Sequence, residues 1–229
     1  MPPTSPTWFE QLFGFAEGDY ATTQRRFRSE GTTLHSLANG RTFHIGTFST
    51  PTLASLRERV ASAPRGALQV RHEAIHDVLG LHAAPQNRGA LFQAASQFNC
   101  LEFCDSHVIP EEGVTDYQHD RTQGPACALA TAGATVYRNY LVPVRGIPGQ
   151  TRDRQLDLTD ELAATLGAPG EFWDVINGYT ESDAPRLRRL HDALATHGRD
   201  ALLGTLKIGL QHDVGVDFQA RFEETQTPT

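Results

Sequence analysis

The sequence has few cysteines and no long apolar run. Its 229 residues include three cysteines, an odd and small number that argues against a disulfide framework and favours free thiols in a reducing compartment. No stretch approaches the roughly 18 consecutive apolar residues that a membrane-spanning helix requires. The N-terminal stretch MPPTSPTWFEQLFGF lacks the charged, apolar and small-residue segments of a secretory signal. These absences predict a cytoplasmic protein that does not enter a membrane.

An excess of positive charge is also missing. The chain has 20 Lys and Arg against 27 Asp and Glu, a formal net charge of -7, which does not favour long-range attraction to nucleic acid or to an anionic membrane. Two local clusters of arginine have the spacing of a solvated helix face, with a row of phosphate contacts as the alternative. The clusters are Arg25, Arg26 and Arg28, and Arg186, Arg188 and Arg189.

The first 65 residues predict short helices and a hairpin. Aromatic residues spread over positions 8–27 are typical of one or two short helices packed by large side chains, forming a lid or brace. Asn39-Gly40, between TTLHSL and RTFHIG, is typical of a tight hairpin turn with positive φ angles. Ser49 and Thr50 before Pro51, followed by LASLRERV, predict a helix with a hydroxyl cap and a proline in its first turn.

The rest of the chain predicts strands and helices in alternation. The apolar runs ALQVRHEAI and GALFQAA predict strands, with residues 90–95 as a buried central one. A polar loop over 109–123 precedes a helix rich in small residues, and YLVPV predicts another strand. LTDELAATLG and PRLRRLHDALATHG predict helices that end at Gly167 and Gly198. LKIGLQHDVGV predicts a last strand and turn.

This alternation predicts an α/β domain with a mixed central sheet flanked by helices. We expect residues 1–229 to form a single domain, in which 1–65 are an N-terminal helical and hairpin extension and 66–229 form the core. The alternative is two subdomains that divide near residue 65.

Polar residues gather where the predicted central strand ends. In α/β sheets, ligands bind where loops leave the carboxyl ends of central strands, because helix N-termini and free backbone amides point there. The segment that leaves this strand ends in Ser96, Gln97, Asn99 and Glu102, which are able to hydrogen-bond a sugar or hold a water molecule. Gly124 then lets the backbone approach an anion at the start of the next helix. The segment from Leu91 to Leu129 therefore predicts a site for a ligand that contains phosphate.

The stretch HDVLGLHAAPQNRGALFQAASQFNCLE followed by QGPACALATAG resembles the core of a macrodomain, the fold that binds and in several branches hydrolyses ADP-ribose. The resemblance covers residues 75–140. Asp77-Val78 matches the Asp-Ile pair of that family, residues 92–96 match its Val-Asn-Ala-Ala-Asn strand, and Gly124-Pro125-Ala126 matches its glycine-rich loop. His76 stands where the family has glycine, and Ser96 stands where the strand motif ends in asparagine.

The resemblance implies a macrodomain-like core and roles for individual residues. Asp77 would contact the adenine amino group, and the backbone from Gly124 to Cys127 would hold the diphosphate. Asp120 would act as general base beside the distal ribose. Asn99 and Gln123 would complete the catalytic set, with Val78, Gln93, Ser96, Glu102, Thr122, Pro125 and Ala126 among the ligand-binding residues. The alternative interpretation of Asp120 and its neighbours is a set of solvated loop charges.

A rival motif lies in HEAIHDVLGLH. His72, Glu73, His76 and His82 have a spacing that resembles that of the metzincin proteases, in which histidines bind zinc and the glutamate activates water. Gly80 lies one residue later than the glycine of that family, and the only methionine is Met1, so the methionine turn is absent. The macrodomain interpretation needs no cofactor, whereas this alternative needs zinc.

Two further groups of residues have open interpretations. Gln211-His212-Asp213 follows a predicted strand, so Gln211 and Asp213 are either part of a second ligand loop or of an ordinary polar turn. Trp8, Tyr20 and Phe27 either stack on a base or belong to the core. The leading hypothesis is a domain that binds ADP-ribose or an ADP-ribosylated macromolecule and hydrolyses the linkage. A zinc hydrolase and a binding module without catalysis are the alternatives.

Overall fold

The computed structural model describes residues 6–63, 66–71, 81, 83–93, 106–119, 130–167 and 170–216. In these residues short helices alternate with small antiparallel sheets, so the chain has a mixed α/β fold. The largest sheet has three strands, and three further strand pairs are separate from it. The single mixed sheet of a macrodomain-like core is therefore not confirmed in the part of the chain that the structure describes.

Two short helices begin the described chain, as the sequence predicts. Helix α1 (Trp8–Phe13) starts with a reciprocal cap, because the Thr7 hydroxyl accepts the backbone N–H of Glu10 while the Glu10 carboxylate accepts that of Thr7. Gly14 ends the helix in the left-handed conformation with φ 81°. Helix α2 (Tyr20–Gln24) starts at Asp19, whose side chain accepts the backbone N–H of Thr22 at 3.0 Å.

A three-stranded antiparallel sheet follows the two helices. Its strands are β1 (Phe27–Glu30), β2 (Thr33–Ser36) and β3 (Thr42–His44), in sequence order. In this register Leu34 lies opposite Ser29 and Phe43. Leu34 and Phe43 are buried, so this face of the sheet packs against the helices.

The hairpin predicted at Asn39-Gly40 is confirmed, but its turn is wider than expected. Five residues, 37–41, separate β2 from β3, and the backbone N–H of Gly40 donates to Ser36 O at 3.0 Å. Only Gly40 has a positive φ, 73°, so the turn is not the two-residue type in which both residues adopt that conformation. Asn39 instead donates its side-chain amide to Leu12 O at 2.9 Å, which ties the turn to α1.

The main core lies between α1, the sheet and a helical segment from the second half of the chain. This segment is α5 (Ala132–Val136), continued by the π-helical turn η5 (Tyr137–Leu141). The rings of Phe13 and Phe43 have centroids 4.8 Å apart, and Tyr140 packs at 4.8 Å from Tyr20. Trp8 and Phe27 are buried in this aromatic core, and the half-buried Tyr20 packs against it, which favours the core interpretation over base stacking.

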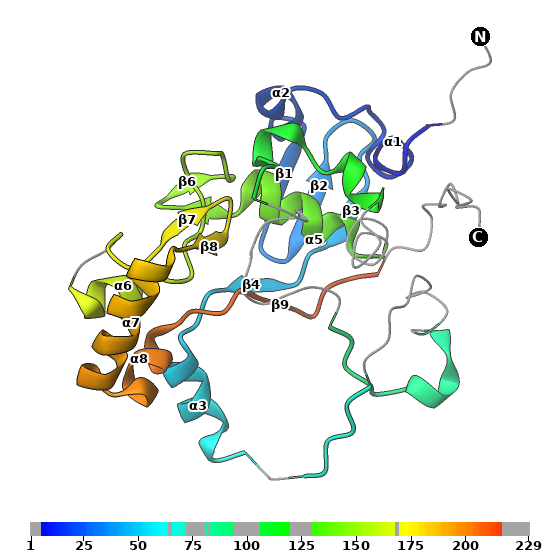
Figure 1. Ribbon diagram of the computed structural model, residues 1–229. Coiled ribbons are helices and arrows are strands. Elements are labelled where there is room, and N and C mark those ends of the chain that lie inside the picture. The colour runs from blue at the N-terminus through cyan, green and yellow to red at the C-terminus, as the bar shows by residue number, and fades with distance from the viewer. Residues whose placement is uncertain are drawn as a thin grey trace, which may run out of the picture.

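The second half of the chain forms hairpins and helices. Two elements from the first half of the chain join it: helix α3 (Leu53–Ala61) packs on α8 (Arg199–Thr205), and β4 (Thr47–Ser49) pairs with β9 (Leu210–His212). Figure 1 shows the β4–β9 pair between the aromatic core with its sheet and the group that contains α3, α6, α7 and α8. The remaining elements of this part are β5 (Pro143–Val144), β6 (Ile147–Pro148), α6 (Asp160–Leu166), β7 (Asp174–Ile176), β8 (Tyr179–Glu181) and α7 (Ala184–His197).

Several local predictions in this half are confirmed. Helices α6 and α7 end at Gly167 and Gly198, whose φ angles are 76° and 84°. A last strand and turn are present, but the strand is β9 (Leu210–His212), so Gln211 and His212 lie in the strand and not after it as predicted. The arginine cluster 186–189 lies on α7, as predicted, and Arg186 pairs there with Asp174. The cluster 25–28 is exposed but lies between the end of α2 and strand β1, so its prediction as a helix face is wrong.

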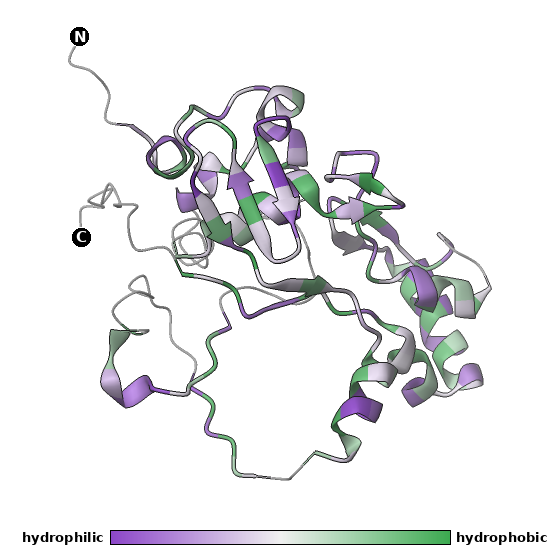
Figure 2. Cartoon of the chain, turned by 180° about the vertical axis from the view of Figure 1, so that it is seen from behind, coloured by the Kyte–Doolittle hydropathy of each residue, from purple (hydrophilic) through white to green (hydrophobic). Residues whose placement is uncertain are grey.

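The two strands predicted around residues 66–71 and 90–95 are wrong in their described parts. Residues 66–71 and 90–93 belong to no strand pair, and Leu68 and Leu91 are 85% and 94% exposed. The 3₁₀ turn η1 (Pro85–Asn87) precedes residues 90–93. Residues 68–71, in the described segment that follows α3, alternate apolar and polar positions (Figure 2). Alternation predicts a strand only where a second backbone offers hydrogen bonds, and no strand in the described residues pairs with this run.

Two element boundaries also differ from expectation. Tyr140 and Leu141, predicted in a strand, continue the helical segment, because the N–H of Val142 donates to Tyr137 O at 2.8 Å. The strand is limited to Pro143–Val144. The cap of α3 is Thr52, whose hydroxyl accepts the N–H of Ser55, so Pro51 precedes the helix instead of lying in its first turn.

Candidate ligand site around the polar loop and the start of α5

Most of the predicted site lies outside the described residues. This applies to the proposed catalytic residues, to nearly all of the proposed ligand-binding residues and to the histidines of the zinc alternative. These are Asp120, Asn99 and Gln123; Asp77, Val78, Ser96, Glu102, Thr122, Gly124, Pro125, Ala126 and Cys127; and His72, His76 and His82. The structure does describe Gln93, Gln211, Asp213 and the segments that flank residues 120–129.

Gln93 does not lie at the end of a buried strand. It is exposed and belongs to the segment 90–93, which forms no strand pair. The strand predicted to contain Gln93 is therefore wrong in its described part, whereas the ligand-binding role of Gln93 stays a prediction.

Gln211 links the sheet region to the helical segment. Its side-chain N–H₂ group donates to Ile45 O at 2.7 Å, and its side-chain oxygen accepts a hydrogen bond from the Arg138 guanidinium of η5. Arg138 also donates to the Thr135 hydroxyl at 3.3 Å. Both polar atoms of the Gln211 side chain are thus used within the fold, which favours a structural role over membership of a second ligand loop.

Asp213 occupies the turn after β9. It has φ 56°, a left-handed conformation that is uncommon for residues other than glycine. Its carboxylate lies 2.8 Å from Nδ1 of His212, and the side chain is largely exposed. The turn returns to the sheet through the N–H of Gly215, which donates to His44 O at 2.8 Å.

The polar loop predicted over 109–123 has regular structure where it is described. It contains two 3₁₀ turns, η2 (Pro110–Glu112) and η3 (Thr115–His119). The Glu17 carboxylate accepts the backbone N–H groups of Val114 and Thr115 at 2.9 and 2.7 Å, and the Tyr140 hydroxyl at 2.6 Å. The loop is therefore attached to the N-terminal region instead of extending freely into solvent.

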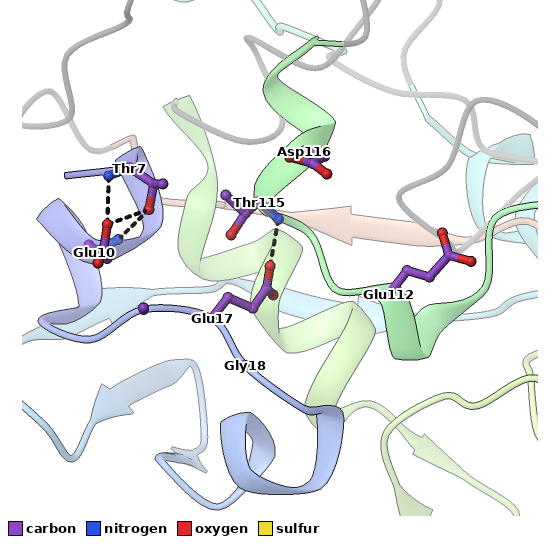
Figure 3. Close-up of a pocket in the computed structure, with 8 residues that line it drawn as sticks. Thr7, Glu10, Glu17, Gly18, Glu112, Thr115 and Asp116 are labelled. Atoms are coloured by element: carbon purple, nitrogen blue, oxygen red, sulfur yellow. Dashed lines mark hydrogen bonds between the residues drawn. The ribbon is translucent and has the colours of Figure 1, made fainter. Parts of the chain in front are cut away.

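A shallow hollow of about 230 Å³ lies beside this attachment (Figure 3). It is strongly acidic, so it does not provide the positive potential that a diphosphate requires. Its lining residues are Thr7, Glu10, Ala16, Glu17, Gly18, Glu112, Thr115 and Asp116. The predicted diphosphate position, at the start of the helix after Gly124, does not include any of them.

The buried Tyr140 and the half-buried Tyr20, both near the loop, remain protonated. Burial raises the pKa of the Tyr140 phenol far above its usual range, and the neighbouring charge of Glu17 raises it further. Burial likewise raises the pKa of Tyr20, whose hydroxyl donates to Asn139 O at 2.8 Å. Both groups act as neutral hydrogen-bond donors that hold the fold together.

The helix that follows the predicted phosphate loop packs closely on the sheet. Ala130 is buried, and a Cβ atom on Gly133 would lie 2.6 Å from Cβ of Phe43. The sequence predicted a small-residue helix in close contact with its neighbours, and this is confirmed for residues 132–136. Residues 120–129 thus connect η3 to a helix that is fixed in the core.

Comparison with known proteins identifies no relative: no family model, no curated protein and no solved structure matches the chain. Within the described residues, no group of three or more His, Cys, Asp or Glu side chains is arranged to hold a metal ion. None of the described helices is both long and apolar enough to cross a membrane.

Sequence reasoning did not identify Glu17. It lies between two short helices in an ordinary-looking AEGD segment, and its partners are about 100 residues further along the chain. No local pattern marks such a residue, because its role depends on the tertiary contact alone.

Proposed function

We propose that this protein binds ADP-ribose or a related nucleoside diphosphate ribose and hydrolyses ADP-ribosyl linkages to a macromolecule. The proposal depends on the macrodomain resemblance of residues 75–140. One structural observation supports it: the segment expected to hold the ligand is anchored at both ends. Tyr117 before it and Ala130 after it are buried.

Anchored ends favour binding because less conformational freedom is lost when the ligand is captured. Residues 120–129 carry Asp120, Gln123 and Gly124, which supply a carboxylate, an amide and a glycine that permits close approach of the backbone. Backbone N–H groups at the start of a helix are suited to the charge of a diphosphate.

The proposed reaction is a hydrolysis with no change of oxidation state. Asp120 would accept a proton from a water molecule as the water oxygen bonds to the distal ribose carbon that carries the macromolecule. The bond from that carbon to the acceptor breaks, and the acceptor leaves with a proton. Asn99 and Gln123 would hydrogen-bond the ribose or the water.

Titration calorimetry with ADP-ribose tests the binding step. We expect heat of binding with ADP-ribose and much weaker binding with AMP, which lacks the diphosphate and the distal ribose. A wild-type protein that gives no heat at millimolar ADP-ribose would falsify the proposal.

Variants of Asp120 separate an enzyme from a binding module. We expect Asp120→Ala to lower the turnover of an ADP-ribosylated protein by about 10²–10⁴-fold, the usual contribution of a general base, with a smaller change in affinity. Asn99→Ala should also lower turnover. Asp116→Ala is the matched control, because Asp116 is an exposed carboxylate of η3 four residues earlier. Full turnover in Asp120→Ala removes the base assignment, and ADP-ribose binding without wild-type turnover indicates a binding module.

One observation favours keeping the zinc hydrolase as a second candidate. Leu81 and Ala83, on either side of His82, have helical backbone, and a helix is the structure that an HExxH zinc motif requires. Metal analysis of protein purified without chelator should then find about one zinc ion per chain. His72→Ala and His76→Ala should lose it, whereas His191→Ala, an exposed histidine of α7, should retain it. Wild-type protein without zinc eliminates this candidate.

A further inference from the structure

Among the described carboxylates near the polar loop, Glu17 makes the most extensive contacts, with both of its oxygens engaged. Its two oxygens lie 2.9 Å from the backbone nitrogen of Val114, and one of them lies 2.7 Å from that of Thr115. Figure 3 shows the side chain reaching across from the segment before α2 to Thr115. The Tyr140 hydroxyl donates to the other oxygen, so one carboxylate joins the loop to the buried helical segment.

A second residue of the N-terminal region holds the same point of the loop. The indole Nε1 of Trp8 donates to Thr115 O at 2.7 Å, and Trp8 is 1% exposed. Both the N–H and the C=O of Thr115 are therefore held by side chains from the first 17 residues. The preceding Gly113 has φ 87°, and a Cβ atom there would lie 2.6 Å from the Glu17 carboxylate, so only glycine allows this close approach.

The held residue is the first residue of η3. This turn runs from Thr115 to His119, and Tyr117 in its middle is buried in the core. Asp120, the proposed general base, is the next residue in the chain. The held residue thus begins the turn whose last residue, His119, directly precedes Asp120 in the sequence.

The charge of Glu17 matters for this attachment. Hydrogen bonds from backbone N–H groups to a carboxylate are shorter and stronger than those to a neutral acceptor. A glutamine has the same shape but presents one oxygen and one N–H₂ group, so it can accept from the backbone N–H groups at one atom only. Loss of the carboxylate would release the start of η3 without removing any group from the proposed ligand site.

We infer that Glu17 is a positioning residue for the ligand site of this protein, because it fixes the start of η3 and thereby the entry to residues 120–129. The inference rests on the proposed function. It gives the N-terminal region a role beyond packing: Glu17 and Trp8 hold Thr115 at the start of the turn that leads to the proposed ligand segment, so less conformational freedom of this turn is lost on binding.

The test compares Glu17→Gln with two controls in the full chain. We expect Glu17→Gln to bind ADP-ribose about tenfold more weakly in calorimetry, and to show faster hydrogen exchange at the Val114 and Thr115 amides. Glu112→Gln is the local control, because it lines the same hollow and is exposed. Leu162→Ala is the stability control, because it removes a buried side chain from α6. Both controls should bind ADP-ribose as the wild type does.

Each outcome has a distinct meaning. Wild-type protein that does not bind ADP-ribose overturns the proposed function and this inference with it. Wild-type binding with unchanged affinity in Glu17→Gln overturns the inference alone, as does an equal loss of affinity in Leu162→Ala, which would show a general effect of stability. If Glu17→Gln does not fold, Tyr140→Phe carries the test. It removes one donor to the same carboxylate and should weaken binding by about threefold; unchanged affinity in Tyr140→Phe would then overturn the inference.

Discussion

Gly133 is the point where α5 comes closest to the sheet. A Cβ atom on this residue would lie 2.6 Å from Cβ of Phe43 and 3.5 Å from Cγ2 of Ile45. Cβ of Phe43 is fixed by the backbone of β3, so the clash cannot be relieved by a side-chain rotation. A helix interior normally disfavours glycine by about 1 kcal/mol relative to alanine, so close packing is the physical reason for this residue.

We therefore expect Gly133→Ala to lower the free energy of unfolding by about 1–3 kcal/mol, in spite of the gain in helix propensity. Urea denaturation followed by circular dichroism measures the change. Gly66→Ala is the control, because nothing lies within 4 Å of a Cβ atom there and its φ is not in the left-handed region. A Gly133→Ala protein as stable as the wild type would show that α5 moves away from the sheet at little cost.

Several helices of the chain have cap residues that mark where they begin or end. Helices α6 and α7 end at Gly167 and Gly198, the glycines at which the sequence predicts their ends. Helices α2 and α7 begin at Asp19 and Asp183, whose side chains accept backbone N–H groups of the first turn. Such signals are local, so the sequence predicts them well. The cap of α3 shows the limit: three hydroxyl residues surround Pro51, and the one used is Thr52.

The cap of α2 has a consequence for pH dependence. The hydrogen bonds from Thr22 hold the pKa of the Asp19 carboxyl below its ordinary value of 3.8. A lowered pKa means that this carboxylate contributes stability above its ordinary pKa, and that the contribution is lost as the pH falls through the folded value. We expect Asp19→Asn, which keeps a capping oxygen, to lose less stability than the wild type below about pH 4.

Thermal denaturation between pH 6 and pH 3 compares the two proteins, and NMR titration of Asp19 measures its pKa directly. Hydrogen bonds from Arg186 also lower the pKa of Asp174, so both proteins lose the stability that this carboxylate contributes as the pH falls. The stability of Asp19→Asn should therefore decrease less steeply with falling pH than that of the wild type, but it should still decrease. An Asp19 that titrates at or above 3.8 contradicts this account of the cap.

At the scale of the whole molecule, the core joins distant parts of the chain. Aromatic residues of 8–43 pack against Val136 and Tyr140, and β4 pairs with β9 across more than 160 residues. These contacts cross residue 65, where the sequence offers a division into two subdomains as the alternative to one domain. A chain that begins at residue 66 would expose the aromatic face of the helical segment 132–141.

We expect residues 66–229 expressed alone to lack a cooperative unfolding transition, because most of the aromatic core is missing. Differential scanning calorimetry or chemical denaturation checks this. Adding residues 1–65 as a separate chain should restore part of the transition. Cooperative unfolding of 66–229 alone would favour two subdomains and would leave the single-domain prediction wrong.

The sequence by itself determined the helices with marked ends, the hairpin at Asn39-Gly40 and the small-residue helix after the polar loop. These depend on caps, turn residues and side-chain size, which act over a few positions. Only the tertiary structure decided which apolar runs became strands: those at 66–71 and 90–93 found no backbone partner in the described residues and remain exposed. It also decided the role of Glu17, because a carboxylate becomes an anchor only where folding brings the N–H groups of Val114 and Thr115 to it.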